Sequence, residues 1–412
     1  MSFNTYENAR RLISELGADA SDPQTRDSAR FAADRLRTGT RAGDCDQLRL
    51  AIENMTGGAN TVLYDDAGRP SIMCALPMMT MDDLYGNGDD SPHPAWIVAG
   101  DVKKVIYVSK YMNSIEGGRA YSLPMVAPAT YNTFDDCIEA CLRKGRGWHL
   151  MTNVEWMAIA QWSKRNGTRP HGNTGAGCYH RATHERGVPA TMFDGRAHLT
   201  KTGSGPVTWS HNHDASGITD LVGNMFEWVG GLRLMDGVFQ IIPNNDAALY
   251  DANLLKADSR RWRALTTDGV LAAHGELDTL KVDGDVPGDM REDDHLIGSP
   301  IVSTGIAHRS YLGIHTDGNQ AYLDCDFCDL RADSSTPVPR IAQVLGMLPD
   351  ETCTHEDGIF VARNYGERIA VRGGKAGSLD RAGLNALHFY NPRTYDGSAT
   401  IGFRCAYVDL DM

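Results

Sequence analysis

The sequence predicts a mixed α+β fold, and three observations support this prediction. Residues 1–56 contain apolar side chains at helical spacing among Arg, Glu and Asp. From Asn60 onwards, short β-branched and aromatic segments alternate with turn residues, which is typical of strands. Within this strand-rich part, Thr133 and Thr152 each precede a helical apolar pattern and have an acidic residue three positions later.

The first block of the chain, residues 1–57, is predicted to be a small helical segment. Asn8–Leu16 and Ala29–Leu36 have helix-like apolar spacing, Leu48–Met55 is a third candidate helix, and a pair of glycines ends the block. A helical segment of this kind is either an assembly or attachment element or a cap on the main domain. The sequence leaves both roles open.

Residues 58–412 are predicted to form one larger domain. Thr61–Tyr64 and Ser71–Leu76 flank Asp65–Gly68, and strands that flank such a turn form a hairpin. The acidic stretch at about 243–300 is expected to be an insertion into this domain and not a domain of its own.

Two helices are expected in the middle of the domain. Thr133 is followed by Asp136, and Thr152 is followed by Glu155. The second pair matches a capping box, in which two side chains accept hydrogen bonds from each other's backbone N–H groups. The residues after the second helix, Asn166–Gly187, are rich in Gly, His and Asn and are predicted to be a loop.

Composition and charge exclude several classes of function. With 412 residues, of which 42% are apolar and 23% charged, the chain is an ordinary globular sequence that can bury a full core. No apolar run approaches the roughly 20 residues of a membrane span, and residues 1–5 lack the features of a signal peptide. A net charge of −13 disfavours general nucleic-acid binding, which needs a basic face. We therefore expect synthesis in a cytoplasm without a secretory signal, no membrane insertion and no nucleic-acid partner.

The last forty residues of the chain have a distinctive composition. Ala370–Gly374 and Ile401–Ala406 have the apolar residues and glycines of fixed framework, and Ile401–Val408 is predicted to be a buried closing strand. Between them, Ala376–Thr400 contains no Lys, Glu, Gln, Met or Trp. It consists mainly of small polar residues, Tyr, His and Arg, a composition close to that of an antibody paratope. The alternative is an ordinary surface loop, because turns favour several of the same residues.

Four segments of the sequence carry a resemblance to a known family. They occur in the order Trp148–Trp156, Asp220–Trp228, Arg372–Gly374 and Gly402–Cys405. Together they resemble the formylglycine-generating (sulfatase-modifying) family, a branch of the C-type lectin fold. The resemblance implies an α+β C-type lectin fold of the formylglycine-generating type, preceded by the helical segment and interrupted by the insertion.

Further stretches carry a closer resemblance. Together with the C-terminal cassette (residues 370–408), they are Asn60–Pro70, His93–Trp96, Ile106–Tyr111, Ala120–Pro124 and Pro170–Asn173. They resemble the variable proteins of diversity-generating retroelements, especially those of phages and prophages. In such systems an error-prone reverse transcriptase randomises adenines. Codons of the form A-A-pyrimidine then cannot become codons for Lys, Glu, Gln, Met or Trp, which matches the residues absent from Ala376–Thr400.

This resemblance implies a non-catalytic protein that binds a ligand or receptor through its cassette. The ligand would be a protein or glycan of a host-cell surface. The setting would be a phage tail or other virion surface, with other virion proteins as partners, and some relatives imply a homo-oligomer. Leu387 and Phe389 would be framework, alternating with His388 and Tyr390. The residues expected to face the ligand are Ser378, Asp380, Arg381, Asn385, His388, Tyr390, Asn391, Arg393, Tyr395 and Ser398.

A metal-dependent oxidase of the formylglycine-generating type is the main alternative. Those enzymes carry a copper-binding cysteine pair just before the final Gly-Phe-Arg motif. This chain has no cysteine between Arg372 and Arg404, and Cys405 stands alone behind the motif. A soft-metal site needs at least two converging thiolates. Iron-dependent relatives need a histidine cluster from a helical domain, and residues 1–56 contain no His. We therefore expect neither catalysis nor a redox cofactor. A purely structural virion protein is a further alternative.

The resemblance also implies a structural calcium site at Asp220–Glu227. Asp220 and Glu227 would supply carboxylates, and Gly223 and Met225 would supply backbone carbonyls. Such hard oxygen ligands suit calcium. The alternative is that the two acidic side chains cap turns by accepting hydrogen bonds from backbone N–H groups.

Cysteines and histidines elsewhere form less specific patterns. The nine cysteines have no disulfide-like spacing and are expected to be mostly reduced. Cys325, Cys328, Cys353 and His355 have the ligand types of a zinc site but only half of its usual spacing, so scattered thiols are the alternative. The histidines of the 166–187 loop have no clear periodicity, and no catalytic role is expected for them.

Overall fold

The computed structural model describes residues 45–411 apart from 288–290, 293–294, 311–319, 352, 354–356 and 397–398, together with 13–14, 18, 25–26 and 28–29. Over these residues the protein combines helices with a larger number of strands, which confirms the predicted α+β class. No helix among them is long and apolar enough to cross a membrane.

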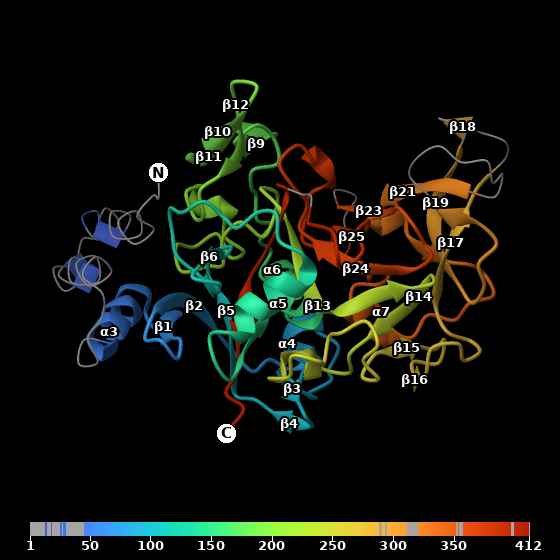
Figure 1. Ribbon diagram of the computed structural model, residues 1–412, viewed down its shortest axis with the longest axis horizontal. Helices are drawn as coiled ribbons and strands as arrows, with labels where there is room; N and C mark the ends of the chain where they lie inside the picture. The colour runs from blue at the N-terminus through green and yellow to red at the C-terminus, as the bar shows by residue number, and fades with distance from the viewer. Residues whose placement is uncertain are drawn as a thin grey trace.

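The smaller of the two main sheets joins the beginning of the domain to its end (Figure 1). The predicted hairpin is confirmed, with Asn60 opposite Cys74 and Tyr64 opposite Pro70 in antiparallel register. The last strand of the chain lies between two strands from the first half of the domain. In spatial order the strands are β1 (Asn60–Tyr64), β2 (Pro70–Pro77), β5 (Val105–Ser109), β27 (Cys405–Tyr407) and β8 (Trp148–Leu150).

The larger sheet contains the cassette strands and most of the second half of the chain. In spatial order its main strands are β16 (Leu271–Ala272), β15 (Arg263–Leu265), β14 (Val238–Ile241), β17 (Lys281–Asp285), β19 (His295–Ser303), β21 (Gln320–Asp326), β23 (Gly358–Val361), β25 (Leu387–Phe389), β24 (Glu367–Arg372), β13 (Phe226–Met235) and β26 (Ile401–Phe403). Short strands attached to it are β18 (Arg291–Glu292), β20 (Arg309–Ser310) and β22 (Arg331–Ala332). The stretch expected to be an insertion, 243–300, supplies β15 to β19 and is therefore continuous with this sheet.

Both predicted helix starts in the middle of the domain are confirmed as capping boxes. The Thr133 hydroxyl accepts from Asp136 N at 3.0 Å, and the Thr152 hydroxyl accepts from Glu155 N at 3.2 Å. The α-helices are α3 (Cys45–Thr56), α4 (Met81–Tyr85), α5 (Phe134–Leu142), α6 (Asn153–Arg165) and α7 (Arg340–Val344). The 3-10 helices are η1 (Pro94–Trp96), η2 (Val207–Trp209), η3 (Asp246–Ala248), η4 (Phe327–Asp329) and η5 (Leu379–Arg381).

Four short hairpins lie outside the two main sheets in the described residues. One of them lies in the 166–187 stretch, which was predicted to be a loop. The prediction was wrong there because these strands lack the apolar alternation that marks a half-buried strand. The hairpins are β3 (Ile97–Val98) with β4 (Asp101–Val102), β6 (Ser114–Glu116) with β7 (Arg119–Tyr121), β9 (Cys178–Tyr179) with β10 (Ala182–Arg186), and β11 (Pro189–Phe193) with β12 (Arg196–Thr200).

The closing segment forms two strands where one was predicted. β26 pairs in parallel with β13 in the larger sheet, and β27 pairs with β5 and β8 in the smaller one. The chain therefore passes from one sheet to the other at Arg404. A continuous buried apolar pattern does not reveal this change, because both strands are buried.

The predicted third helix of the N-terminal segment is confirmed as α3, which caps the main domain. Leu48 and Ile52 on this helix pack in one cluster with Val62 and Ile72 of the first hairpin. The expected helices at 8–16 and 29–36 lie largely outside the described residues.

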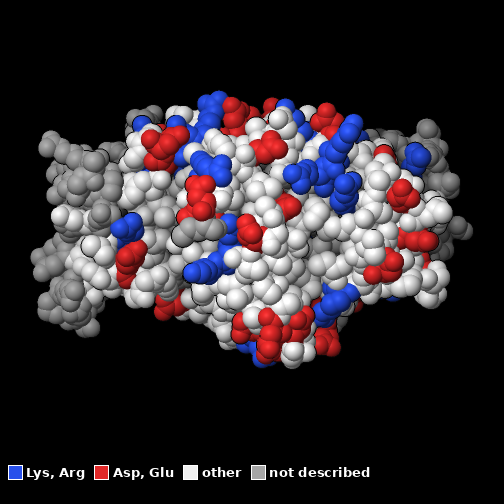
Figure 2. Space-filling model, turned by 90° about the horizontal axis from the view of Figure 1, so that it is seen from below, with Lys and Arg blue, Asp and Glu red and all other residues white. Residues whose placement is uncertain are grey.

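On the face shown in Figure 2, acidic and basic side chains are interspersed.

Candidate ligand-binding site

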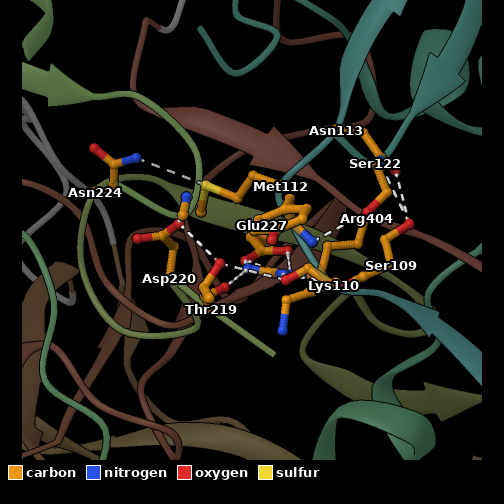
Figure 3. A network of polar contacts seen from close by, with 12 residues as sticks. Ser109, Lys110, Met112, Asn113, Ser122, Thr219, Asp220, Asn224, Glu227 and Arg404 are labelled. Atoms are coloured by element: carbon orange, nitrogen blue, oxygen red, sulfur yellow. Dashed lines mark hydrogen bonds and ion pairs between the residues drawn. The ribbon is translucent and has the colours of Figure 1, made fainter. Parts of the chain in front are cut away.

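Arg404, the residue at which the chain changes sheets, holds the end of the cassette (Figure 3). Its guanidinium is completely buried and donates to both carboxylate oxygens of Glu227 at 2.8 to 3.0 Å. It also donates to the carbonyls of Ser109, Lys110 and Thr219 at 3.3, 3.2 and 2.7 Å. One side chain thus ties the cassette to β5, to β13 and to the segment before β13.

These contacts occupy oxygen atoms that a calcium ion at the predicted site would need. Both oxygens of Glu227 accept hydrogen bonds from Arg404, which also neutralises the carboxylate charge. The carbonyl of Gly223 accepts from Met225 N at 2.7 Å. Within the described part of the chain, no group of three His, Cys, Asp or Glu side chains is placed to hold a metal ion. Glu227 and Gly223, two of the four predicted ligands, therefore have their oxygens engaged within the protein, whereas a calcium shell needs several available oxygens.

Asp220, the other predicted carboxylate ligand, is a buried acid with one satisfied oxygen. Its Oδ2 accepts from Gly203 N at 2.7 Å and from the Thr219 hydroxyl at 3.1 Å, so it bonds a backbone amide as the turn-capping alternative expects. Its Oδ1 is buried and has no hydrogen-bond partner among the described residues. Burial raises the pKa of Asp220, against the lowering effects of these hydrogen bonds and of Arg404.

A second buried arginine, Arg372, holds the beginning of the cassette. Its Nε and Nη2 donate to Asn153 Oδ1 at 3.0 and 2.8 Å, and Nη2 and Nη1 donate to the carbonyls of Gly346 at 3.0 Å and Asn385 at 3.3 Å. Burial lowers the pKa of Arg372 to about 9. The side chain therefore joins the start of α6 and the turn after α7 to the cassette.

The glycine pair that follows permits the close backbone approach expected from the sequence. Gly373 and Gly374 have φ of +91° and +83°. A Cβ at Gly373 would lie 2.5 Å from the Leu221 carbonyl oxygen, and one at Gly374 would lie 2.6 Å from Ala382. Any larger residue would push the cassette away from its support.

The middle of the cassette enters the larger sheet as β25. This strand runs parallel to β23 and antiparallel to β24, with Leu387 opposite both Ile359 and Arg372. Leu387 and Phe389 are buried, while His388 is partly exposed and Tyr390 is 39% exposed. The predicted alternation of framework and outward residues is therefore confirmed.

The outward face of these strands is the floor of a cleft of about 460 Å³, here called the aromatic cleft. Phe360 forms its centre, with ring centroids 5.3 Å from Tyr322, 5.7 Å from His388 and 5.9 Å from Tyr390. Phe226 adds a further ring 4.5 Å from His388. The predicted contact residues that line this cleft are Ser378, Arg381, His388, Tyr390, Asn391 and Tyr395.

Two buried polar atoms in the cleft lack a partner within the described chain. They are Nε2 of His388 and Oδ1 of Asn391. Burial lowers the pKa of His388 to about 3, and the nearby charges of Arg381 and Lys375 act in the same direction. The imidazole is therefore neutral at ordinary pH and offers one donor or acceptor nitrogen to a ligand.

Part of the cleft comes from residues that the sequence reasoning did not select. Tyr322 and Phe360 lie on β21 and β23, outside the cassette. The available signal was their alternation with the buried residues Leu323, Ile359 and Val361, which identifies outward positions on a strand. That signal does not say which strands become neighbours of the cassette.

Arg381 closes one side of the cleft and is held in place by the same strands. It forms an ion pair with Asp324 and donates to the carbonyls of Cys325 at 2.8 Å and Ile359 at 3.2 Å. A second carboxylate, of Asp326, lies 3.5 Å away. This predicted contact residue is therefore also a brace between the cassette and β21.

Three of the predicted contact residues are buried, and for one of them, Arg393, the contacts correct the assignment. Arg393 donates to Glu367 at 2.7 and 2.9 Å and to Asp135 at 2.7 Å and serves as framework. Asn385 donates its backbone N–H to Asp357 at 2.7 Å, and Asn391 exposes only 4% of its surface at the cleft wall. Polar composition alone does not distinguish a buried polar residue from an exposed one. Ser398 lies outside the described residues.

A second cavity of about 590 Å³, here called the cationic cavity, lies on the other side of the cassette. The predicted contact residues Asp380 and Asn385 line it. Asp380 accepts from His180 Nε2 at 2.6 Å and from Arg181 Nε at 2.8 Å, contacts that lower the pKa of Asp380. His171 contacts Glu185 at 2.9 Å. His171 and His180 are thus hydrogen-bonded to carboxylates.

The cysteines form two close pairs. The sulfur atoms of Cys328 and Cys353 lie 2.9 Å apart, while His355, part of the expected zinc pattern, lies outside the described residues. Cys405, expected to stand alone, lies 2.8 Å from Cys141 of α5. The latter two thiols are completely buried and line neither cavity.

Comparison with known proteins adds no assignment to this geometry. No model of a protein family matches the chain, and a search of curated proteins finds no match to it.

Proposed function

We propose that this protein is a non-catalytic receptor-binding protein whose aromatic cleft is diversified by retroelement mutagenesis. The observation that carries the proposal is the convergence of Ser378, Arg381, His388, Tyr390, Asn391 and Tyr395 on one cleft. The sequence resemblance implies that these positions face the ligand. The residues between them are mostly buried.

The physical form of the cleft supports ligand binding. Its volume lies within the range of roughly 300–1,000 Å³ that is common for small-molecule sites. Aromatic rings supply contact area at small entropic cost. The unpaired atoms of His388 and Asn391 gain most from a ligand that completes their hydrogen bonds, because buried polar atoms without partners are costly.

The support beneath the cleft explains how its surface can vary. Arg372 and Arg404 hold the two ends of the cassette in buried hydrogen-bond networks, and Leu387 and Phe389 fill the core from its middle. Replacement of outward residues leaves these contacts unchanged. Rigid support with exchangeable surface residues is the arrangement that recognition loops use.

The wider setting of the proposal comes from the sequence resemblance. We propose a C-type lectin fold of the formylglycine-generating type, presented on a phage tail or other virion surface. The ligand is a protein or glycan of a host cell, the other partners are virion proteins, and a homo-oligomer raises weak single-site affinity through avidity. The oxidase alternative gains no support from the Cys141–Cys405 pair, because both thiols are enclosed and neither lines a cavity.

The experiment that tests the proposal is sequencing of the DNA around the gene. We expect a near-copy of the cassette codons beside a reverse-transcriptase gene, with differences from the cassette only where the copy carries adenine. These differences should fall at the codons of cleft residues such as His388 and Tyr390 and spare those of Leu387 and Phe389. A gene without such a copy, or differences at the framework codons, would refute the diversified-binder proposal.

A further inference from the structure

We infer that the cationic cavity is a second, constant binding site that takes an acidic saccharide. The aromatic cleft is built largely from the cassette, whereas the basic side chains of the cationic cavity come from outside it. Residues of η5 line both sites, Asp380 in the cationic cavity and Arg381 in the aromatic cleft. A ligand chain that bridges them would be held by one fixed contact and one variable contact.

The charge of the cavity is opposite to that of the whole protein. Its lining contains four basic side chains, Lys164, Arg165, Arg169 and Arg181, and two acidic ones, Asp357 and Asp380, an excess of two positive charges; Lys164 is also 3.8 Å from Asp350, outside the lining. The whole chain has a net charge of −13. A local excess of positive charge in a concave, partly desolvated site attracts anions more strongly than the same charges on an open surface.

The basic residues come from two elements that face each other across the cavity. Lys164 and Arg165 end α6, and Arg169 follows in the next loop. Arg181 lies at the turn of the β9–β10 hairpin. Guanidinium groups match the planar geometry of carboxylate and bind sulfate or phosphate in the same way, so the arrangement favours an oxyanion group on the ligand.

Asp357 opposes this positive charge only weakly. It is buried, its Oδ2 accepts from Asn385 N at 2.7 Å, and burial raises its pKa. Asp380 is the more exposed acid and is paired with Arg181. The negative charges of the lining are therefore engaged within the protein.

The uncharged part of the lining fits a sugar ring better than an extended peptide. His171 and Tyr179 stack in parallel, with ring centroids 4.0 Å apart and an interplanar angle of 11°, and present a flat surface. Gln161 and Thr168 add amide and hydroxyl groups on the same lining. A sugar ring with hydroxyl groups and an acidic substituent can contact the stacked rings, the amide and hydroxyl groups, and the basic side chains.

The cassette adjusts the charge of this constant site through Asp380. This residue contacts both His180 and Arg181, and it is the only described cassette acid that lines the cavity. An uncharged residue at position 380 would raise the net positive charge of the lining by one. The natural exchange of this residue rests on the proposed function, whereas the binding of acidic saccharides does not.

The test is calorimetric titration of the full-length protein with three probes. They are trigalacturonate, a sulfated dextran oligomer and uncharged maltotriose, each at low and high salt. We expect the acidic probes to bind and maltotriose to fail, with affinity falling as salt rises. Inorganic phosphate serves as a fourth probe and should bind at least about tenfold more weakly than the acidic saccharides, because it lacks the ring contacts.

Variants with opposite expected effects on affinity distinguish a loss of binding contacts from a loss of folded protein. The double variant Arg169→Gln/Arg181→Gln should weaken acidic saccharides by about tenfold or more. Asp380→Asn should strengthen them about threefold, because one like charge is removed. The matched control Arg260→Gln/Arg261→Gln removes two exposed charges elsewhere and should leave affinity unchanged.

Three outcomes would overturn the inference. They are equal binding of maltotriose, equal losses in the control and test double variants, and weaker binding by Asp380→Asn. Tyr390→Ala, in the aromatic cleft, should not change saccharide affinity. If cassette variants differ in binding to host cells while no acidic saccharide binds, this inference fails and the proposed function stands.

Discussion

Arg404 and Glu227 form an ion pair in which both side chains are completely buried. Desolvation of two charges is costly, so such a pair gives stability only when its geometry and remaining hydrogen bonds are good. Here the guanidinium donates to three backbone carbonyls besides the carboxylate. The pair therefore fixes the point at which the cassette passes between sheets.

Removing one member of this pair should destabilise the protein strongly. In Glu227→Gln the charge of Arg404 stays buried without its carboxylate, and the free energy of unfolding should fall by about 3–5 kcal/mol. Urea denaturation measures the change. The matched control is Glu139→Gln, which breaks the exposed pair with Arg143 and should cost less than about 0.5 kcal/mol. Equal losses in both variants would contradict the framework role of Glu227.

Asp220→Asn should have the opposite effect and a defined pH dependence. Because burial raises the pKa of Asp220, its folded value lies above its unfolded value of about 3.9. Its contribution to stability is complete at low pH and is lost as pH rises through the folded pKa. The asparagine variant does not titrate, so it should gain stability relative to the wild type over this range and be the more stable protein at neutral pH.

Thermal unfolding from pH 3 to 8, with and without calcium, checks this expectation. Calcium should not raise the melting temperature of the wild type, because the carboxylate of Glu227 and the carbonyl of Gly223 are engaged within the protein. A calcium-dependent rise that disappears in Asp220→Asn would instead restore the calcium site implied by the resemblance.

At the scale of single elements, β25 shows how framework and surface share one strand. Its side chains alternate between the core and the aromatic cleft because successive residues of a strand point to opposite faces. Buried framework residues and outward-facing residues therefore alternate along one strand and do not fall into separate segments.

Substitutions at two neighbouring positions should separate these roles. Phe389→Ala removes a buried ring and should lower the free energy of unfolding by about 3–5 kcal/mol. Tyr390→Ala should change it by less than about 1 kcal/mol, because the residue is 39% exposed. Chemical denaturation measures both, and adsorption to host cells should fall for Tyr390→Ala. A Tyr390→Ala protein that unfolds as readily as Phe389→Ala would contradict this division.

The two capping boxes allow a similar comparison between helices. Thr152 caps α6 and also donates to Asn245 Oδ1 at 2.7 Å in a buried site, whereas Thr133 caps the more exposed start of α5. Thr152→Ala should cost roughly 2–3 kcal/mol and Thr133→Ala about 1 kcal/mol. Differential scanning calorimetry should order the melting temperatures accordingly; the reverse order would mean that α6 does not depend on its cap.

At the scale of the whole molecule, the cassette belongs to both sheets. β24, β25 and β26 lie in the larger sheet and β27 lies in the smaller one, near the strands that follow α3 (Figure 1). The cassette is thus threaded through the core, and its ends are held by contacts with distant parts of the chain.

This arrangement predicts at which cassette positions randomised residues are compatible with folding. Random residues at Ser378, Asp380, His388, Tyr390 and Tyr395 should give mostly folded protein, because single surface changes are usually worth less than about 0.5 kcal/mol. Random residues at Arg372, Gly373, Phe389, Arg393 and Arg404 should give mostly insoluble protein. The soluble fraction of each library, measured by a split-reporter assay, checks the difference. Similar soluble fractions would show that the cassette is a detachable loop.

Much of the local structure followed from short patterns. The first hairpin, both capping boxes and the alternation in β25 depend on turn residues, side-chain oxygens and apolar spacing within a few residues. The polar hairpin β9–β10 was missed because backbone pairing without apolar alternation leaves no such pattern. The same limit applies to Arg393, whose burial depends on carboxylates of two other elements.

The sequence by itself determined the mixed fold class, the helix starts and those cleft residues that belong to the cassette. Only the tertiary structure decided that Glu227 pairs with Arg404, 177 positions away, and that Cys405 lies beside Cys141, 264 positions away. It also decided which polar cassette residues are buried. The physical reason is that burial and charge pairing depend on neighbours in space, and local patterns do not specify which distant elements become those neighbours.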